Sequence, residues 1–78
     1  MIYFSETFKA LRKDKNLTQE QLAEIFNVSP QAISRWETGS TYPDITLLPI
    51  IANFFGLSID DLLGSSQDKI KARVDYYM

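Results

Sequence analysis

The sequence predicts an all-α domain built from five short helices. Apolar residues recur along the chain at the spacing that places them on one face of a helix. Residues that favour helix caps separate these stretches at short intervals. The 78 residues support a single domain. A chain of this length buries only about 60–65% of its unfolded surface, so the predicted core is small.

The first helix is expected over about residues 4–14. Phe4, Phe8 and Leu11 fall at positions i, i+4 and i+7, which places them on one face of a helix. We therefore assign these aromatic side chains to the core. The segment KDKN then connects this helix to the next one.

Residues 18–39 predict two helices joined by a tight turn. Thr18 can cap the first of them, because its hydroxyl can accept the backbone N–H of Gln21 while the Gln21 side chain bonds back to the Thr18 N–H. Asn27 tolerates the left-handed backbone conformation that ends a helix. The apolar residues between these ends recur at helical spacing: Leu22, Ala23, Ile25 and Phe26.

The second helix of this pair has its own start and stop signals. Ser29 can cap it, Pro30 fits its first position, where no N–H is needed, and Gly39 can end it. Only three residues separate the two helices, so they must cross at a steep angle in a helix-turn-helix. Ile33 and Trp36 form the side expected to be buried. The opposite side is expected to be exposed and is rich in hydrogen-bonding groups. Its residues are Pro30, Gln31, Ala32, Ser34, Arg35 and Thr38.

The fourth helix is expected over about residues 45–55, and two residues compete to cap it. If Asp44 is the cap, Pro49 removes a hydrogen bond and strains the first turn. If Thr46 is the cap, Pro49 sits in the first turn without that cost. The sequence leaves this choice open. The residues expected to pack inward are Leu47, Leu48, Ile51, Ala52 and Phe55.

A fifth short helix follows Gly56, which ends the fourth. Ser58 and Asp61 have the spacing of a capping box at its start, and Gly64 is expected to close it. Asp60 and Asp61 need no metal to explain them, because the helix dipole favours acidic residues in a first turn.

The composition excludes several classes of active site. The chain has no cysteine and no histidine, so it lacks disulfides, thiolate ligands and the commonest general base. No constellation of nucleophile, base and orienting group is visible. We therefore expect no enzyme activity, no metal site and no cofactor, and no small-molecule substrate is evident. No apolar run approaches 18 residues and no signal-peptide pattern follows Met1, so we expect a soluble, cytoplasmic protein without a membrane span.

The net charge of −2 argues mildly against a nucleic-acid partner. Its distribution matters more than its sum. Asp44, Asp60 and Asp61 lie beyond the helix pair. The basic residues of the first half are Lys9, Arg12, Lys13, Lys15 and Arg35. A local positive surface can therefore coexist with an acidic total, with weaker non-specific binding as the consequence.

The run LTQEQLAEIFNVSPQAISRWETGSTYPD resembles the Cro/cI-type helix-turn-helix, the lambda-repressor-like DNA-binding domain of XRE-family regulators. The resemblance extends over about residues 8–63 and includes LRKDKNLTQ before the motif and LSIDDLLG after it. The family usually has Gly where this chain has Asn27, a mild departure because Asn also tolerates the left-handed conformation. The resemblance implies a five-helix, lambda-repressor-like fold.

The resemblance also implies which residues meet double-stranded DNA. A recognition helix, about residues 30–38, would enter the major groove, where Arg35 suits guanine, Gln31 suits adenine and Ala32 suits a thymine methyl. Phosphate contacts are expected from Gln19, Ser29, Pro30, Ser34, Thr41 and Tyr42. Arg12 and Glu37 would form a brace that fixes the angle of the recognition helix. The alternative for that pair is two solvated charges worth under about 1 kcal/mol.

Two classes of function are compared for the whole chain. The first is sequence-specific DNA binding by a transcriptional regulator, expected to be a repressor that acts as a homodimer on a pseudo-palindromic operator. The second is a protein-interaction module, such as an antitoxin-type adaptor, which the acidic balance and the apolar C-terminus favour.

The sequence divides into a helix-turn-helix domain over residues 4–64 and a C-terminal tail over residues 65–78. Ile70, Val74 and Tyr77 in the tail have helical spacing. A docking helix, a dimer contact, a truncated linker and disorder all stay open for this segment. The operator sequence and any effector are not readable from the residues.

Overall fold

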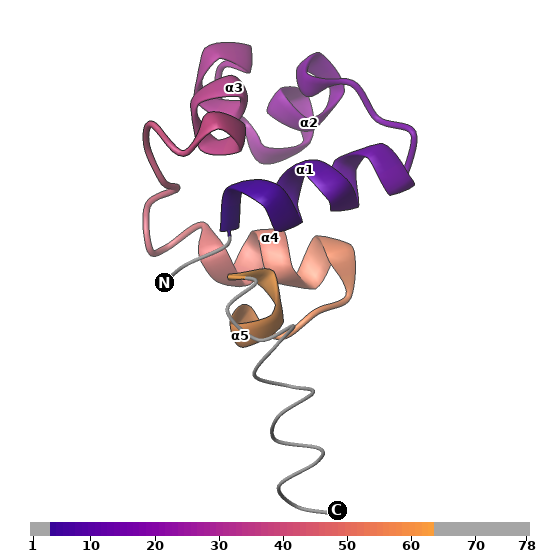
Figure 1. Cartoon of the computed structure of the whole chain (residues 1–78), viewed down its shortest axis with the longest axis vertical. Helices are drawn as coiled ribbons and strands as arrows, with labels where there is room; N and C mark the ends of the chain where they lie inside the picture. Colours follow the sequence, from indigo (N-terminus) through magenta and orange to yellow (C-terminus); the bar gives the residue numbers. More distant parts are fainter. Residues whose placement is uncertain (1–3, 64–78) are drawn as a thin grey trace, which may run out of the picture.

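A computed structural model describes residues 4–63 of the chain (Figure 1). Within that range the protein is all-α, as predicted, and contains no strand. The helices are α1 (Phe4–Asp14), α2 (Gln19–Phe26), α3 (Pro30–Thr38), α4 (Leu48–Phe55) and α5 (Ile59–Leu62). The predictions for Gly64 and for the tail over residues 65–78 lie outside the described residues. None of the helices between residues 4 and 63 is long and apolar enough to cross a membrane.

Helix α1 lies between the α2–α3 pair and the α4–α5 pair (Figure 1). Phe8 on α1 is fully buried, and its ring lies edge-on to the rings of Trp36 and Phe55, at centroid distances of 5.8 and 6.0 Å. The Phe4 ring stacks on it at 5.2 Å. One side chain of α1 therefore contacts both α3 and α4. Such aromatic pairs stabilise the fold by more than the area they bury would suggest. The predicted core face of α1 is confirmed.

The ends of α2 follow the local signals. The Thr18 hydroxyl accepts the Gln21 N–H at 3.0 Å, and Gln21 Oε1 accepts the Thr18 N–H at 2.8 Å. Asn27 has φ 56° and ψ 47°, the left-handed conformation predicted for it. Leu22 is fully buried, whereas Ile25 is 45% exposed, so helical spacing alone does not say which of the apolar residues of this helix are buried. The face of α2 that packs on the core contains Leu22, Ala23 and Phe26 and leaves out Ile25.

Helix α3 begins and ends as the sequence predicts. Ser29 Oγ accepts the Ala32 N–H at 3.1 Å, and Pro30 occupies the first turn. Gly39 ends the helix with φ 81°, which a residue with a side chain adopts only under strain. Ile33 is fully buried.

Helix α4 is shorter than predicted and starts at Leu48, because residues 45–47 form a turn. Asp44 stabilises this turn through its side chain, where Oδ1 accepts the Thr46 N–H at 3.1 Å. Its carbonyl also accepts the Leu47 N–H at 2.8 Å. Leu47 is the cap residue and makes no side-chain cap bond. Neither Asp44 nor Thr46 therefore caps the helix.

Pro49 lies in the first turn of α4. The Ile45 carbonyl, which a helical N–H at position 49 would otherwise approach, accepts the Leu48 N–H at 3.3 Å. The proline therefore leaves that carbonyl satisfied, and the first turn tolerates it. Helix α5 is capped by Ser58, whose Oγ accepts the Asp61 N–H at 3.1 Å.

Candidate nucleic-acid interface

The surface that could meet a partner is organised by α2 and α3, which pack against each other across the turn at residues 27–29. Leu22 and Ile33 are fully buried and hold the two helices to the core. The short turn and the buried contacts leave the opposite side of α3 facing outward. This is the side on which the sequence places the base-reading residues.

The three candidates for base readout differ in exposure. Gln31 and Arg35 are exposed on α3, one helical turn apart. Ala32 is half-buried and packs against the core. The structure therefore leaves two long polar side chains free to reach a groove, whereas Ala32 offers only a limited methyl contact.

The candidates for phosphate contact lie on three segments around α3. Ser29 and Pro30 are exposed at its start, and Ser34 is half-buried within it. The Ser29 hydroxyl already accepts the Ala32 N–H, but its own proton is free to donate.

Thr41 and Tyr42 are exposed in the loop that follows α3. The Arg35 carbonyl accepts the Ser40 N–H at 2.9 Å and the Thr41 N–H at 3.4 Å. This loop is therefore anchored to the end of α3. The Tyr42 ring also lies edge-on to Phe4, with centroids 6.2 Å apart.

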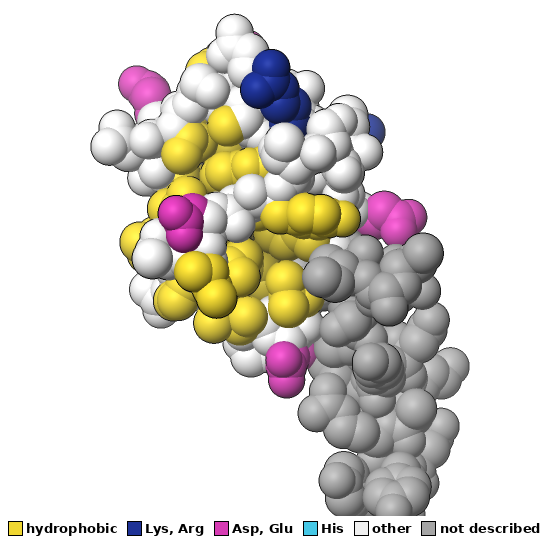
Figure 2. All heavy atoms as spheres, turned by 90° about the vertical axis from the view of Figure 1, so that its left-hand side faces the viewer, with side chains coloured by type: hydrophobic (Ala, Val, Ile, Leu, Met, Phe, Trp, Pro, Cys, Tyr) yellow, Lys and Arg dark blue, Asp and Glu magenta, His cyan; other side chains and the backbone are white. Residues whose placement is uncertain are grey.

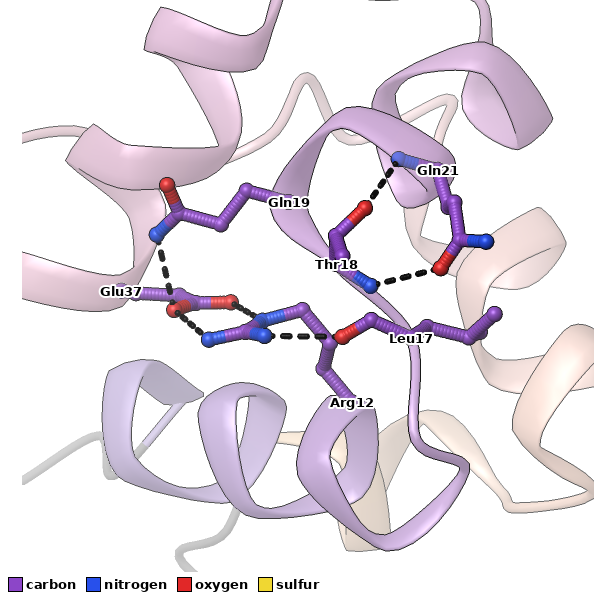
Figure 3. A network of polar contacts seen from close by, with 6 residues as sticks. All are labelled: Arg12, Leu17, Thr18, Gln19, Gln21 and Glu37. Carbon is purple, nitrogen blue, oxygen red and sulfur yellow. Dashed lines mark hydrogen bonds and ion pairs between the residues drawn. The ribbon is translucent and has the colours of Figure 1, made fainter.

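Arg12 of α1 and Glu37 of α3 meet between these two helices (Figure 3). Arg12 Nε donates to Glu37 Oε2 at 2.6 Å, and Nη2 donates to Oε1 at 3.0 Å. The third donor, Nη1, binds the Leu17 carbonyl at 2.8 Å. Only 13% of the Arg12 side chain and 3% of the Glu37 side chain are exposed. The pair is therefore a shielded, two-bond contact rather than two solvated charges.

The electrostatics of this pair follow from its contacts. The pKa of Arg12 is raised above its ordinary value, chiefly by the hydrogen bonds that Arg12 donates to Glu37, with a smaller attraction from the charges of Glu37 and Glu20. Burial acts in the opposite direction and lowers the pKa. Arg12 therefore stays charged and compensates the buried carboxylate.

Gln19 joins this network from the first residue of α2. Its Nε2 donates to Glu37 Oε1 at 3.1 Å (Figure 3). The sequence predicts a phosphate contact for Gln19 and the brace for Glu37, but it gives no sign of the bond between them. The two residues are 18 positions apart in different helices, so no local spacing signals the contact.

Comparison with known proteins identifies the arrangement of these helices. The helix-turn-helix family matches residues 8–62 of the chain, which include all of α2, α3 and α4. The chain belongs to this helix-turn-helix family of DNA-binding transcriptional regulators. The resemblance to Cro/cI-type (XRE-family) regulators is confirmed, and the family is a non-enzymatic one.

Two curated relatives show the range of proteins that share this domain. The HTH-type transcriptional activator BcrR of Enterococcus faecalis is 50% identical over 64 residues, which are 82% of this chain and 31% of BcrR. Antitoxin PezA of Streptococcus pneumoniae is 35% identical over 72 residues, which are 92% of this chain and 44% of PezA. The chain therefore spans less than half the length of these two helix-turn-helix relatives.

A solved structure agrees with the fold. The crystal structure of a transcriptional regulator from Listeria innocua matches with a TM-score of 0.80 and 37% identity. The match covers 86% of this chain and 63% of the Listeria chain. The lambda-repressor-like, all-α helix-turn-helix fold is thereby confirmed.

Proposed function

We propose that this helix-turn-helix chain binds a specific double-stranded DNA sequence by inserting α3 into the major groove. The observation that carries the proposal is the exposed face of α3, on which Gln31 and Arg35 are free while Ile33 and Trp36 hold the opposite face in the core. A helix with one buried side and a free polar side fits the width of the major groove.

The proposed contacts follow the exposure of the side chains. Arg35 would bind guanine through O6 and N7, and Gln31 would bind adenine through N6 and N7. Ala32 would touch a thymine methyl from its half-buried position. The proposed phosphate contacts surround α3 and fix its register without reading sequence: Gln19, Ser29, Pro30, Ser34, Thr41 and Tyr42.

We further propose that two copies act together on a pseudo-palindromic operator. A homodimer would place two α3 helices in successive major grooves, about 34–36 Å apart. A single short domain rarely reaches operator affinity through one helix alone. We propose that the chain acts in the cytoplasm and represses transcription. Occupancy of an operator is enough to block transcription, whereas activation needs a further contact. BcrR, by its name, is an activator.

In-vitro selection from a random duplex pool tests this proposal. The expected result is an enriched motif with two symmetric half-sites whose centres are one helical turn apart. Duplex binding should also weaken steeply with salt, because phosphate contacts release counterions. A selection that enriches no motif, together with binding that does not respond to salt, would refute sequence-specific DNA binding.

A second candidate is a protein-interaction module of the antitoxin type. PezA is named an antitoxin, and hydrophobic side chains gather on the face seen in Figure 2. Within residues 4–63, exposed large hydrophobic side chains beyond α3 are Tyr42, Ile45, Ile50 and Ile59. Burial of such residues stabilises protein interfaces. Salt separates the two candidates, since an apolar protein contact keeps its affinity at salt concentrations that abolish DNA binding.

A further inference from the structure

We propose that Glu37 is a positioning residue for DNA, because its carboxylate orients the side-chain amide of Gln19 toward the DNA backbone. The inference rests on the proposed function, in which Gln19 lies beside a phosphate. Glu37 would then have two roles. It forms the brace with Arg12, and it orients the neutral side-chain amide of Gln19 on a different helix.

The contact determines which way the Gln19 amide faces. A carboxylate only accepts hydrogen bonds, so the NH₂ group, and not the carbonyl, must face Glu37. Nε2 lies 3.1 Å from Glu37 Oε1, and the amide oxygen points away from the carboxylate (Figure 3). One N–H of the amide is thus engaged and the other keeps a fixed direction. A half-buried, anchored side chain loses less rotamer freedom when it binds than a free one does.

Arg12 makes this arrangement compatible with a nearby phosphate. A bare carboxylate behind the phosphate-binding amide would repel the DNA backbone. Both oxygens of Glu37 instead accept from Arg12, at 2.6 and 3.0 Å, and only 3% of the Glu37 side chain is exposed. The charge is therefore compensated within the domain, and Gln19 donates from an anchored group.

The network also couples the phosphate contact to the recognition helix. Glu37 lies in the last turn of α3, Gln19 is the first residue of α2 and Arg12 comes from α1. The bond between Gln19 and Glu37 therefore sets where the amide at the start of α2 lies relative to α3. Phosphate contacts of this kind position a protein on the duplex and carry no base information.

A double-mutant cycle tests the inference on the full chain. Affinity is measured for the selected operator and for a scrambled duplex of the same length, both at the same salt concentration. Glu37→Gln is expected to weaken binding to the scrambled duplex about tenfold, the effect of one hydrogen bond to a charged group. Binding to the operator should weaken by at least as much, because the substitution also changes the brace that fixes the angle of α3. In a Gln19→Ala chain, Glu37→Gln should cause no further loss of affinity for the scrambled duplex.

Glu20→Gln is the matched control for charge. It removes one negative charge from the first turn of α2, where Glu20 is exposed. Because Glu20 does not hold the Gln19 amide, this substitution should not lower affinity for either duplex. Charge alone would raise affinity in both variants, because the DNA backbone is negative. A loss in Glu20→Gln as large as that of Glu37→Gln would show that the loss does not depend on the contact with Gln19 and would overturn the inference.

Two other results would also overturn it. If Glu37→Gln lowered affinity for the operator but not for the scrambled duplex, Glu37 would act on the angle of α3. If the loss persisted undiminished in the Gln19→Ala chain, the two residues would act independently. A wild-type chain that bound no duplex would refute the proposed function itself, and this inference with it.

A second variant covers the case in which Glu37→Gln does not fold. The double substitution Arg12→Met with Glu37→Leu replaces the ion pair by apolar side chains, a change that often preserves or raises stability. It also removes the acceptor of the Gln19 amide. A folded double variant should therefore show the same loss of affinity for the scrambled duplex. Unchanged affinity in this variant would overturn the inference.

Discussion

Two substitutions on α2 test how the fold uses the apolar residues of this helix. Leu22 is fully buried, whereas Ile25 is 45% exposed. Leu22→Ala leaves a cavity in the core and should lower the free energy of unfolding by about 2–5 kcal/mol. Ile25→Ala removes a side chain that keeps nearly half its surface in water, so we expect a loss of about 1 kcal/mol or less.

The pair is a matched comparison because both changes end at alanine in the same helix. Ile25→Ala gains slightly more helix propensity than Leu22→Ala, a difference of a few tenths of a kcal/mol at most that is small beside the cost of the cavity. The free energy of unfolding of a chain this size is itself only about 4–12 kcal/mol. In a domain of this size, Tm falls by about 4–8 °C for each kcal/mol lost. Thermal unfolding followed by circular dichroism should therefore show a fall of roughly 10–40 °C for Leu22→Ala and of only a few degrees for Ile25→Ala.

Equal shifts for the two variants would refute the reasoning, because they would mean that the core does not distinguish the two faces of α2. An unchanged Tm for Leu22→Ala would refute the position of the core itself. A DNA-binding measurement at a temperature where both variants are folded serves as a second readout. Affinity there should resemble that of the wild type, since neither residue is proposed to contact DNA.

Three further predictions concern the recognition helix, the turn and the C-terminus. Arg35→Ala should cost about 1–3 kcal/mol of operator binding and relax preference at one base pair in a repeated selection, and an unchanged motif would exclude Arg35 from base readout. Asn27→Ala should lower the free energy of unfolding by about 1 kcal/mol in urea titration, whereas Asn27→Gly should leave it equal or higher, because Asn27 has φ 56°. Deletion of residues 65–78 should leave the domain folded, since the described core ends at Leu62, but should weaken binding to two half-sites far more than to one. Sedimentation of both chains tests whether that segment forms a dimer contact, and two monomers with equal operator affinity would exclude it.

The local signals in the sequence were sufficient where the structure depends on residues three or four apart. Thr18, Ser29 and Ser58 each accept the N–H three residues further along the chain. A cap is a contact between near neighbours, so its residues identify it. Asn27 and Gly39 follow the same logic, because a left-handed backbone is a property of one residue.

Local signals were insufficient where two of them compete. Asp44 and Thr46 both have cap-forming side chains ahead of α4, yet the Asp44 side chain closes the preceding turn instead. Packing of Leu47 and Ile51 against the core accompanies a helix that begins at Leu48. Pro49 disfavours the longer helix locally, but neither Pro49 nor the two cap-forming side chains identifies Leu47 as the cap residue.

The sequence by itself determined the helix pair, its caps and the polar composition of α3, because these depend on spacing within one helix or one turn. Only the tertiary structure decided that Ile25 faces water, that Ala32 is half-buried and that Gln19 binds Glu37. The first two depend on how the helices pack around the core. The last joins residues from two helices, 18 positions apart, whose distance is set only when the core packs.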